Sequence, residues 1–206
     1  MKRRKFIRNS ALALGAATVA GGVLRFTKSK SGNYSDYFKK LNTSLRQYKK
    51  ANPFLILDLN QLDANIDTLK TLIPNHAKFR IVVKSLPSIE LVEYIQKRAG
   101  TNKLMIFNQP FLTQLSLNAN QDISVLFGKP MPVNSAHFYY ETLIINNGFN
   151  PAKQVQWLVD TELRIKQYIE LAKELNQKLL LNLELDVGLH RGGFDSIEKL
   201  RTALKL

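Results

Sequence analysis

The chain has 206 residues and a formal net charge of +14, with enough apolar residues for one domain with a substantial core. Residues 1–50 hold thirteen Lys and Arg against one acid, whereas residues 51–206 hold seventeen basic and fifteen acidic side chains. The body is therefore nearly neutral, which argues against nucleic-acid binding, and the absence of cysteine excludes disulfides and thiolate metal sites.

Residues 1–26 have the organisation of an export leader. A basic start precedes an apolar run over 11–24 that is short for a membrane span. The sequence RRKFIR at positions 3–8 resembles the twin-arginine export signal. The resemblance implies recognition by the twin-arginine export machinery and a periplasmic location. An uncleaved leader that anchors the chain in the membrane and a chance basic start on a soluble protein are the alternatives.

Residues 27–51 form a basic arm. Within it, apolar residues recur on one helical stripe: Tyr34, Tyr37, Phe38, Leu41, Leu45 and Tyr48. We expect an amphipathic helix over 34–48 that packs on the body, and binding to anionic lipid is the alternative.

Residues 52–206 alternate between strand and helix patterns. Short apolar runs predict strands at 53–59, 79–84, 103–107, 123–127, 155–159 and 178–185. Helix-capping signals lie between them: Asn60, Ser88, Thr161 and either Asp195 or Ser196 as N-caps, and Gly100 as a helix end. A short helix is expected over 135–145. This alternation indicates an α/β fold of parallel βαβ units. A (β/α)8 barrel takes about 250 residues, so we expect an incomplete TIM-type barrel with five to six parallel strands.

The first candidate site stretch is FRIVVKS at 79–85, which ends in Lys84. In parallel α/β folds, reacting groups lie at the carboxyl ends of strands, so Lys84 is expected to face a site. An amine held in an apolar site suits Schiff-base chemistry. The alternative is a strand-end lysine that extends into solvent.

The second stretch is ELDVGLHRGG at 184–193. Gly188, Gly192 and Gly193 permit positive φ or the close approach of another group. Arg191 is a fixed cation that can hydrogen-bond an anionic oxygen. A turn carrying a solvated charge is the alternative.

Asp186 can hold this loop through bonds to backbone N–H groups. His190 is either a metal or substrate contact or a local hydrogen-bonding group. His76 and His137 are expected to be structural, because no partner can be identified from their spacing.

The two stretches, together with PFLILDLN at 53–60, resemble the pyridoxal-phosphate proteins of the alanine racemase amino-terminal domain class. The resemblance covers about residues 52–206. It is closer to the D-threonine aldolase and D-serine dehydratase branch, whose pattern Glu184, Asp186 and Gly188 match. Racemases of the class typically carry a lysine at the position of Glu184. They also have an ANAYG run after the catalytic lysine, where this chain has SLPS.

The resemblance implies that Lys84 forms a Schiff base with pyridoxal 5'-phosphate and that Arg191 lies by the cofactor's phenolic oxygen. It implies a lyase acting on a D-β-hydroxy amino acid, such as D-threonine or D-serine. An amino-acid racemase is the second reading, and a non-catalytic cofactor-binding or interaction protein is the third.

In this class the strand near 54–59 pairs with a C-terminal β domain. That domain, the last barrel strands and the region holding the divalent-metal ligands are absent from the sequence. We therefore expect no metal site within this chain. We also expect no activity from it alone, and open barrel edges that are completed in a homodimer or by a second chain.

Overall fold

The computed structural model describes residues 33–48, 52–85, 88–118, 122–144 and 147–206. By contacts the chain divides into two compact units, residues 1–56 and 57–206. The predicted leader, 1–26, lies outside the described residues. In the first unit, helix α2 spans Asp36–Gln47, which confirms the amphipathic helix, and none of its residues is buried. Within the described part of the chain, no helix has the length and apolarity needed to cross a membrane.

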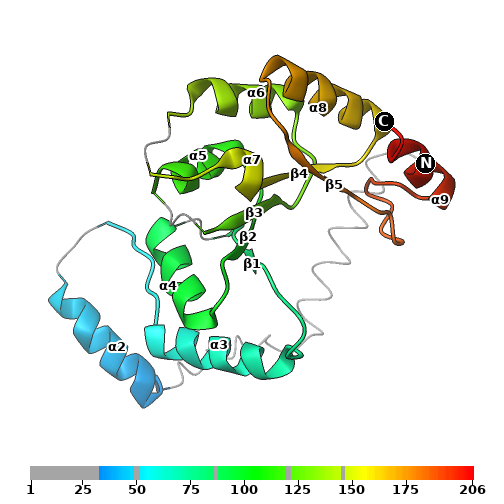
Figure 1. The fold of residues 1–206 in the computed structure, drawn as a ribbon. Helices are drawn as coiled ribbons and strands as arrows, with labels where there is room; N and C mark the ends of the chain where they lie inside the picture. The colour runs from blue at the N-terminus through cyan, green and yellow to red at the C-terminus, as the bar shows by residue number, and fades with distance from the viewer. Residues whose placement is uncertain (1–32, 49–51, 86–87, 119–121, 145–146) are drawn as a thin grey trace, which may run out of the picture. The chain divides into compact units, whose positions relative to one another are not determined.

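The second unit is built on one parallel sheet. Its strands lie side by side in chain order: β1 Ile81–Val82, β2 Lys103–Ile106, β3 Ser124–Phe127, β4 Val155–Val159 and β5 Leu180–Leu183 (Figure 1). The helices are α3 Leu59–Leu72, α4 Ile89–Ala99, α5 Gln109–Asn118, α6 Val133–Thr142, α7 Pro151–Gln154, α8 Glu162–Glu174 and α9 Ile197–Ala203. Parallel strands in sequential order, joined by helices, are consistent with part of a TIM-type barrel. The predicted α/β class and strand number are thus confirmed for the described residues.

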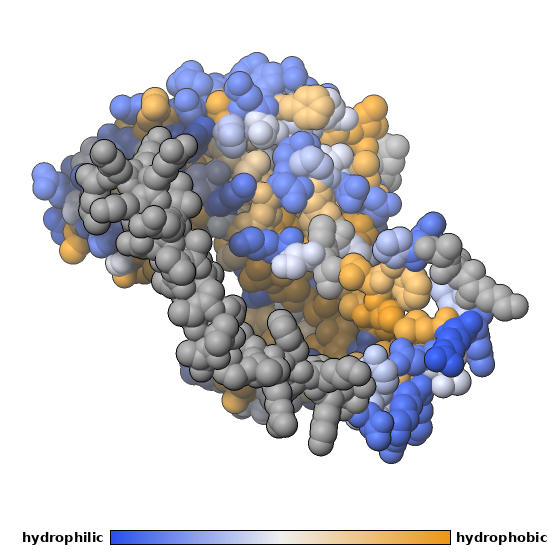
Figure 2. Space-filling view, turned by 180° about the vertical axis from the view of Figure 1, so that it is seen from behind, coloured by the Kyte–Doolittle hydropathy of each residue, from blue (hydrophilic) through white to orange (hydrophobic). Residues whose placement is uncertain are grey.

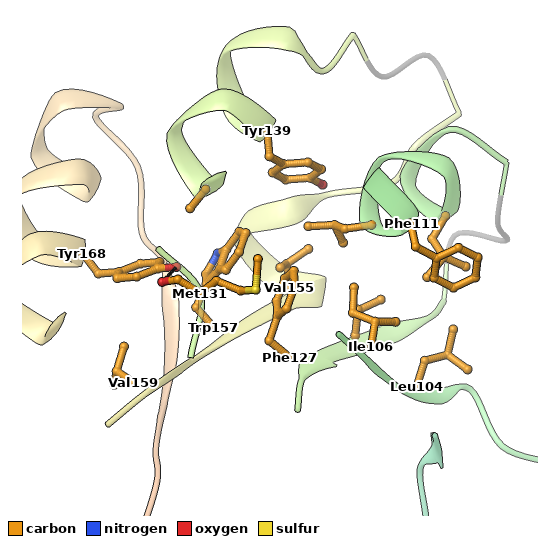
Figure 3. Close-up of a cluster of buried hydrophobic side chains, with 14 of the residues drawn as sticks. Leu104, Ile106, Phe111, Phe127, Met131, Tyr139, Val155, Trp157, Val159 and Tyr168 are labelled. Carbon is orange, nitrogen blue, oxygen red and sulfur yellow. Dashed lines mark hydrogen bonds between the residues drawn. The ribbon is translucent and has the colours of Figure 1, made fainter. Parts of the chain in front are cut away.

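The core lies between the sheet and the helices. Strands β2, β3 and β4 alternate buried and half-buried residues, and the buried set packs against the helices. At its centre the Trp157 ring stacks on Phe127 with centroids 4.5 Å apart (Figure 3). The Trp157 indole N–H donates to the Tyr140 hydroxyl at 3.1 Å. Burial raises the pKa of Tyr140 to about 12, so this hydroxyl stays neutral.

The half-buried residues of the strands, which alternate with the buried ones, include a polar network. Arg80 Nη1 donates to the Ser124 carbonyl at 2.9 Å, and Nη2 donates to Gln156 Oε1 at 3.2 Å. The Asn182 amide also donates to Gln156 Oε1, at 3.0 Å. These bonds link the residue before β1 to β3, β4 and β5. Desolvation lowers the pKa of Arg80 from its ordinary value.

The sequence prediction was wrong at 53–59. No strand forms over these residues; instead α3 begins at Leu59, and Asp58 rather than Asn60 is its N-cap. The Asp58 carboxylate accepts a bond from Gln61 N at 3.1 Å, which satisfies one of the unpaired donors of the first turn. The other caps were predicted correctly, including Ser88, Thr161, Ser196 and a left-handed Gly100.

Apolar residues are exposed along both outer strands of the sheet. Val82 in β1 is 58% exposed and Leu180 in β5 is 37% exposed, with Leu185 beyond β5 at 50%. Figure 2 shows apolar residues, in orange, over a broad area of one face of the molecule. The two edge strands therefore present apolar side chains and unpaired backbone groups, as expected for an open barrel wall.

Candidate active site at the carboxyl edge of the sheet

The five parallel strands bring one residue each to the same edge of the sheet. Counted from β1 to β5, the five residues are Lys84, Phe107, Gly128, Asp160 and Glu184. The residue before each of them packs in the core between the sheet and the helices. Because side chains alternate along a strand, the five residues face the opposite side of the sheet. The carboxyl ends of strands are where α/β folds place reacting groups, so this edge is the candidate site.

Lys84 lies beyond the last paired residue of β1. The preceding residue, Val83, donates its N–H to the Met105 carbonyl at 2.8 Å and is buried, which fixes the strand end. The Lys84 side chain itself is exposed, so the apolar enclosure expected from the sequence is not present around it. Its Nζ lies 5.6 Å from the centroid of the Phe107 ring, over the aromatic face. Lys84 also borders a cavity of about 380 Å³ between β1, α3 and α4.

The Phe107 ring lies against Gly128 at the end of β3. A Cβ on Gly128 would come within 2.5 Å of Phe107 Cζ and 2.9 Å of Met105 Cγ. The ring can take this position only because residue 128 has no side chain. Sequence reasoning assigned no role to Phe107 or Gly128. The available signal was a glycine directly after an apolar strand.

The loop after β5 is closed at its base by backbone bonds. Phe194 N donates to the Glu184 carbonyl at 2.8 Å, and Asp186 N donates to the Phe194 carbonyl at 3.0 Å. Gly193 has φ +97°, and a Cβ there would lie 2.7 Å from the Glu184 carbonyl oxygen. Glycine at 193 is thus required by both backbone angle and space.

Asp186 organises the interior of this loop, as its sequence position predicted. Its Oδ1 accepts from Gly188 N and His190 N, both at 3.0 Å, and Oδ2 lies 2.8 Å from His190 Nδ1. The bond from Gly188 N, followed by those from His190, lowers the pKa of Asp186, so the carboxylate is ionised at neutral pH. His190, at φ +50°, is therefore a local partner of Asp186 in this structure.

Arg191 borders a second cavity, of about 340 Å³, which Lys129, Asp160 and Glu184 also line. None of these four charged side chains forms an ion pair with another described residue. Gly192 lies beside both acids: its Cβ would be 3.7 Å from Asp160 Oδ2 and 3.9 Å from Glu184 Oε2. The cavity thus contains two cations and two carboxylates available for a ligand.

Lys84 and Arg191 share an edge of the sheet but not a cavity. They follow the first and the fifth strand, and each lines a different cavity. At about 4.8 Å per strand, four spacings separate them by roughly 19 Å along a flat sheet, and curvature shortens this distance. The single pocket expected from the sequence is therefore not formed by the described residues.

The residues beside Lys84 fit part of a planar aldehyde cofactor. The amine is exposed and makes no ion pair with another described residue, and the Phe107 face beside it can contact a flat ring. Metal ligands are a different matter: across the described ranges, no group of three or more His, Asp or Glu side chains could hold a metal ion.

Comparison with known protein families gives a match over residues 57–206. A family model described as alanine racemase, N-terminal domain, matches residues 57–206. No curated protein matches the chain. The match covers β1 to β5 and both site stretches, and members of the family typically depend on pyridoxal phosphate. The chain therefore belongs to the alanine racemase N-terminal domain family.

Proposed function

We propose that this chain is a pyridoxal-phosphate-dependent lyase acting on a D-β-hydroxy amino acid. The observation that carries the proposal is the exposed Lys84 amine at the carboxyl end of β1, over the Phe107 ring, in a chain of this family. When bound, pyridoxal phosphate supplies an electron sink for bond cleavage at the substrate's α-carbon.

Each site residue has a proposed part in this chemistry. The Lys84 Nζ would bind the cofactor's aldehyde carbon and afterwards hold or release a proton near the substrate. Arg191 would hydrogen-bond the cofactor's phenolic oxygen, which requires its loop and the Lys84 strand to approach each other in the loaded protein. Asp186 keeps that loop in shape through its bonds to Gly188 and His190.

Glu184 supports the lyase over a racemase. It directly follows β5, close to Gly192, and lines the same cavity as Arg191. A carboxylate here matches the D-threonine aldolase and D-serine dehydratase pattern, whereas racemases typically carry lysine. The racemase remains the second candidate, because the matching family is the one named for alanine racemase.

Product analysis tests the proposal. The chain, together with any polypeptide that copurifies with it, would be incubated with pyridoxal phosphate and D-threonine or D-serine, with and without a divalent metal. The metal belongs in the assay because in the resembling branch a bound divalent metal acts on the substrate's β-oxygen. Glycine with acetaldehyde, or pyruvate with ammonia, supports the lyase. The L-isomer or the α-epimer supports the racemase. Because we expect no activity from the chain alone, cofactor binding without either product indicates the non-catalytic reading only when the polypeptide that completes the sheet is present.

We also propose that the open sheet edges are completed by another polypeptide, either a second copy or a different chain. The exposed Val82 and Leu180 on the two edge strands support this. Size-exclusion chromatography with light scattering distinguishes the two sources: a dimer of the purified chain indicates a second copy. A monomer that gains activity only with a copurifying protein indicates a different chain.

Export by the twin-arginine machinery, with a periplasmic destination, is a further proposal from the RRKFIR sequence. Replacing Arg3 and Arg4 by lysine should retain the chain in the cytoplasm. Cell fractionation measures this, and unchanged export of the double variant would contradict the proposal.

A further inference from the structure

The aromatic stripe, defined as Tyr34, Tyr37, Phe38, Leu41, Leu45 and Tyr48, runs along α2 and the residues that flank it; its aromatic rings are exposed, and Leu41 and Leu45 between them are half-buried. Tyr34 is 67% exposed and Phe38 is 51% exposed. With 3.6 residues per turn, Tyr37, Phe38, Leu41 and Leu45 lie on one side of α2; Tyr48 at the C-cap follows them and Tyr34 precedes the helix. None of the residues in α2 is buried.

Basic side chains lie on the polar face of α2, on either side of the stripe's axis. At 100° per residue Lys40 and Arg46 lie about 110° and 130° from the centre of the stripe, in opposite directions, and neither forms an ion pair with another described residue. The single acid of residues 1–50, Asp36, is already paired with Lys39 at 2.9 Å. The polar face of α2 therefore carries net positive charge.

We propose that α2 lies on an anionic lipid surface, with the aromatic stripe in the interface. Charge complementarity selects this occupant: even without the predicted leader, residues 27–50 carry seven basic side chains against one acid, while residues 51–206 are nearly neutral and offer no matching acidic excess. The composition of the stripe agrees, because tyrosine joins an apolar ring to a polar tip and concentrates at membrane interfaces. Lys40 and Arg46 would extend their stems past the stripe to the lipid headgroups.

Vesicle binding by the full chain tests this proposal. Cosedimentation would compare vesicles of phosphatidylcholine with phosphatidylglycerol against phosphatidylcholine alone. Phe38→Glu places a charge in the stripe, and Thr43→Glu places the same charge on the opposite side of α2 as a matched control. We expect Phe38→Glu to weaken binding to the anionic vesicles about tenfold or more and Thr43→Glu to weaken it much less. Unchanged emission from the buried Trp157 would confirm that both variants retain the folded body.

Hydrogen exchange localises the contact to α2 and separates it from binding by the leader. Amides of residues 36–47 should exchange more slowly when anionic vesicles are added to the wild-type chain, and this protection should be absent in Phe38→Glu. Equal losses of binding in the two variants would overturn the proposal. So would equal binding to both vesicle types, or no vesicle-dependent protection of these amides.

Discussion

Substituting Gly128 by alanine tests how the candidate site is shaped. The new Cβ would lie 2.5 Å and 2.6 Å from Phe107 Cζ and Cε1, and 2.9 Å from Met105 Cγ. Carbon atoms normally approach to about 3.5–4.0 Å, so the ring must move by about 1 Å or change rotamer. Overpacking of this kind costs about 1–3 kcal/mol. Gly128 is not among the residues with positive φ, so the cost is steric rather than conformational.

A double-mutant cycle with Phe107 isolates the cause. Urea unfolding, followed by Trp157 fluorescence, would give the free energy of unfolding of wild type, Gly128→Ala, Phe107→Ala and the double variant. The cost of Gly128→Ala should fall by about 1 kcal/mol or more when Phe107 is already alanine, because the main clash is then gone. Equal costs in the two backgrounds would refute the reasoning. Displacement of the ring should also reduce cofactor attachment at Lys84.

Three further variants test other parts of the structure. For Asp186 the folded pKa is lowered, so its stabilisation of the loop is present above about pH 4 and lost as the pH falls through the folded value. Hydrogen-exchange protection factors of residues 185–193, which correct each rate for the intrinsic pH dependence of amide exchange, should fall on acidification in wild type, whereas Asp186→Asn should show low protection already at neutral pH. His137 lies 2.8 Å from Glu174 and 3.0 Å from Glu141, which raises its pKa. Its contribution is therefore full below about pH 6.5 and lost as the pH rises through the folded value, and the difference in Tm between wild type and His137→Gln should shrink over that range. Arg80→Met should lower the free energy of unfolding by about 1–2 kcal/mol, because the half-buried Ser124 carbonyl and Gln156 Oε1 each lose one donor, although Gln156 Oε1 keeps its bond from Asn182. A urea titration that shows no change would contradict the role of this network.

The central strands were predictable because each is a continuous apolar run ended by turn residues. The predicted ranges 103–107, 123–127 and 155–159 differ from β2, β3 and β4 by at most one residue at an end. The equally apolar stretch 53–59 failed, because periodicity describes a segment but not the partner with which it would pair. With no paired strand beside it, its last residues join α3 through the Asp58 cap.

The site was predictable where it depends on position along a strand and not where it depends on contacts between strands. Lys84 at a carboxyl strand end and the Asp186 bonds to its own loop follow from local sequence. The contact of Phe107 with Gly128 depends on sheet register: Met105 pairs with Leu126, which brings the residues two positions later side by side. The separation of Lys84 and Arg191 into two cavities likewise depends on the number and curvature of the strands between them.

Covalent trapping of the cofactor tests the proposed chemistry most directly. The full chain would be mixed with pyridoxal phosphate, reduced with borohydride, digested and mapped by mass spectrometry, with Lys84→Ala as the comparison. We predict a reduced cofactor adduct concentrated on Lys84 in the wild-type chain and absent from that position in the variant. Before reduction, Lys84→Ala should also lack the Schiff-base absorbance of the wild-type chain. Adducts spread evenly over the other lysines, with Lys84 unlabelled or no more labelled than the rest, would contradict the assignment.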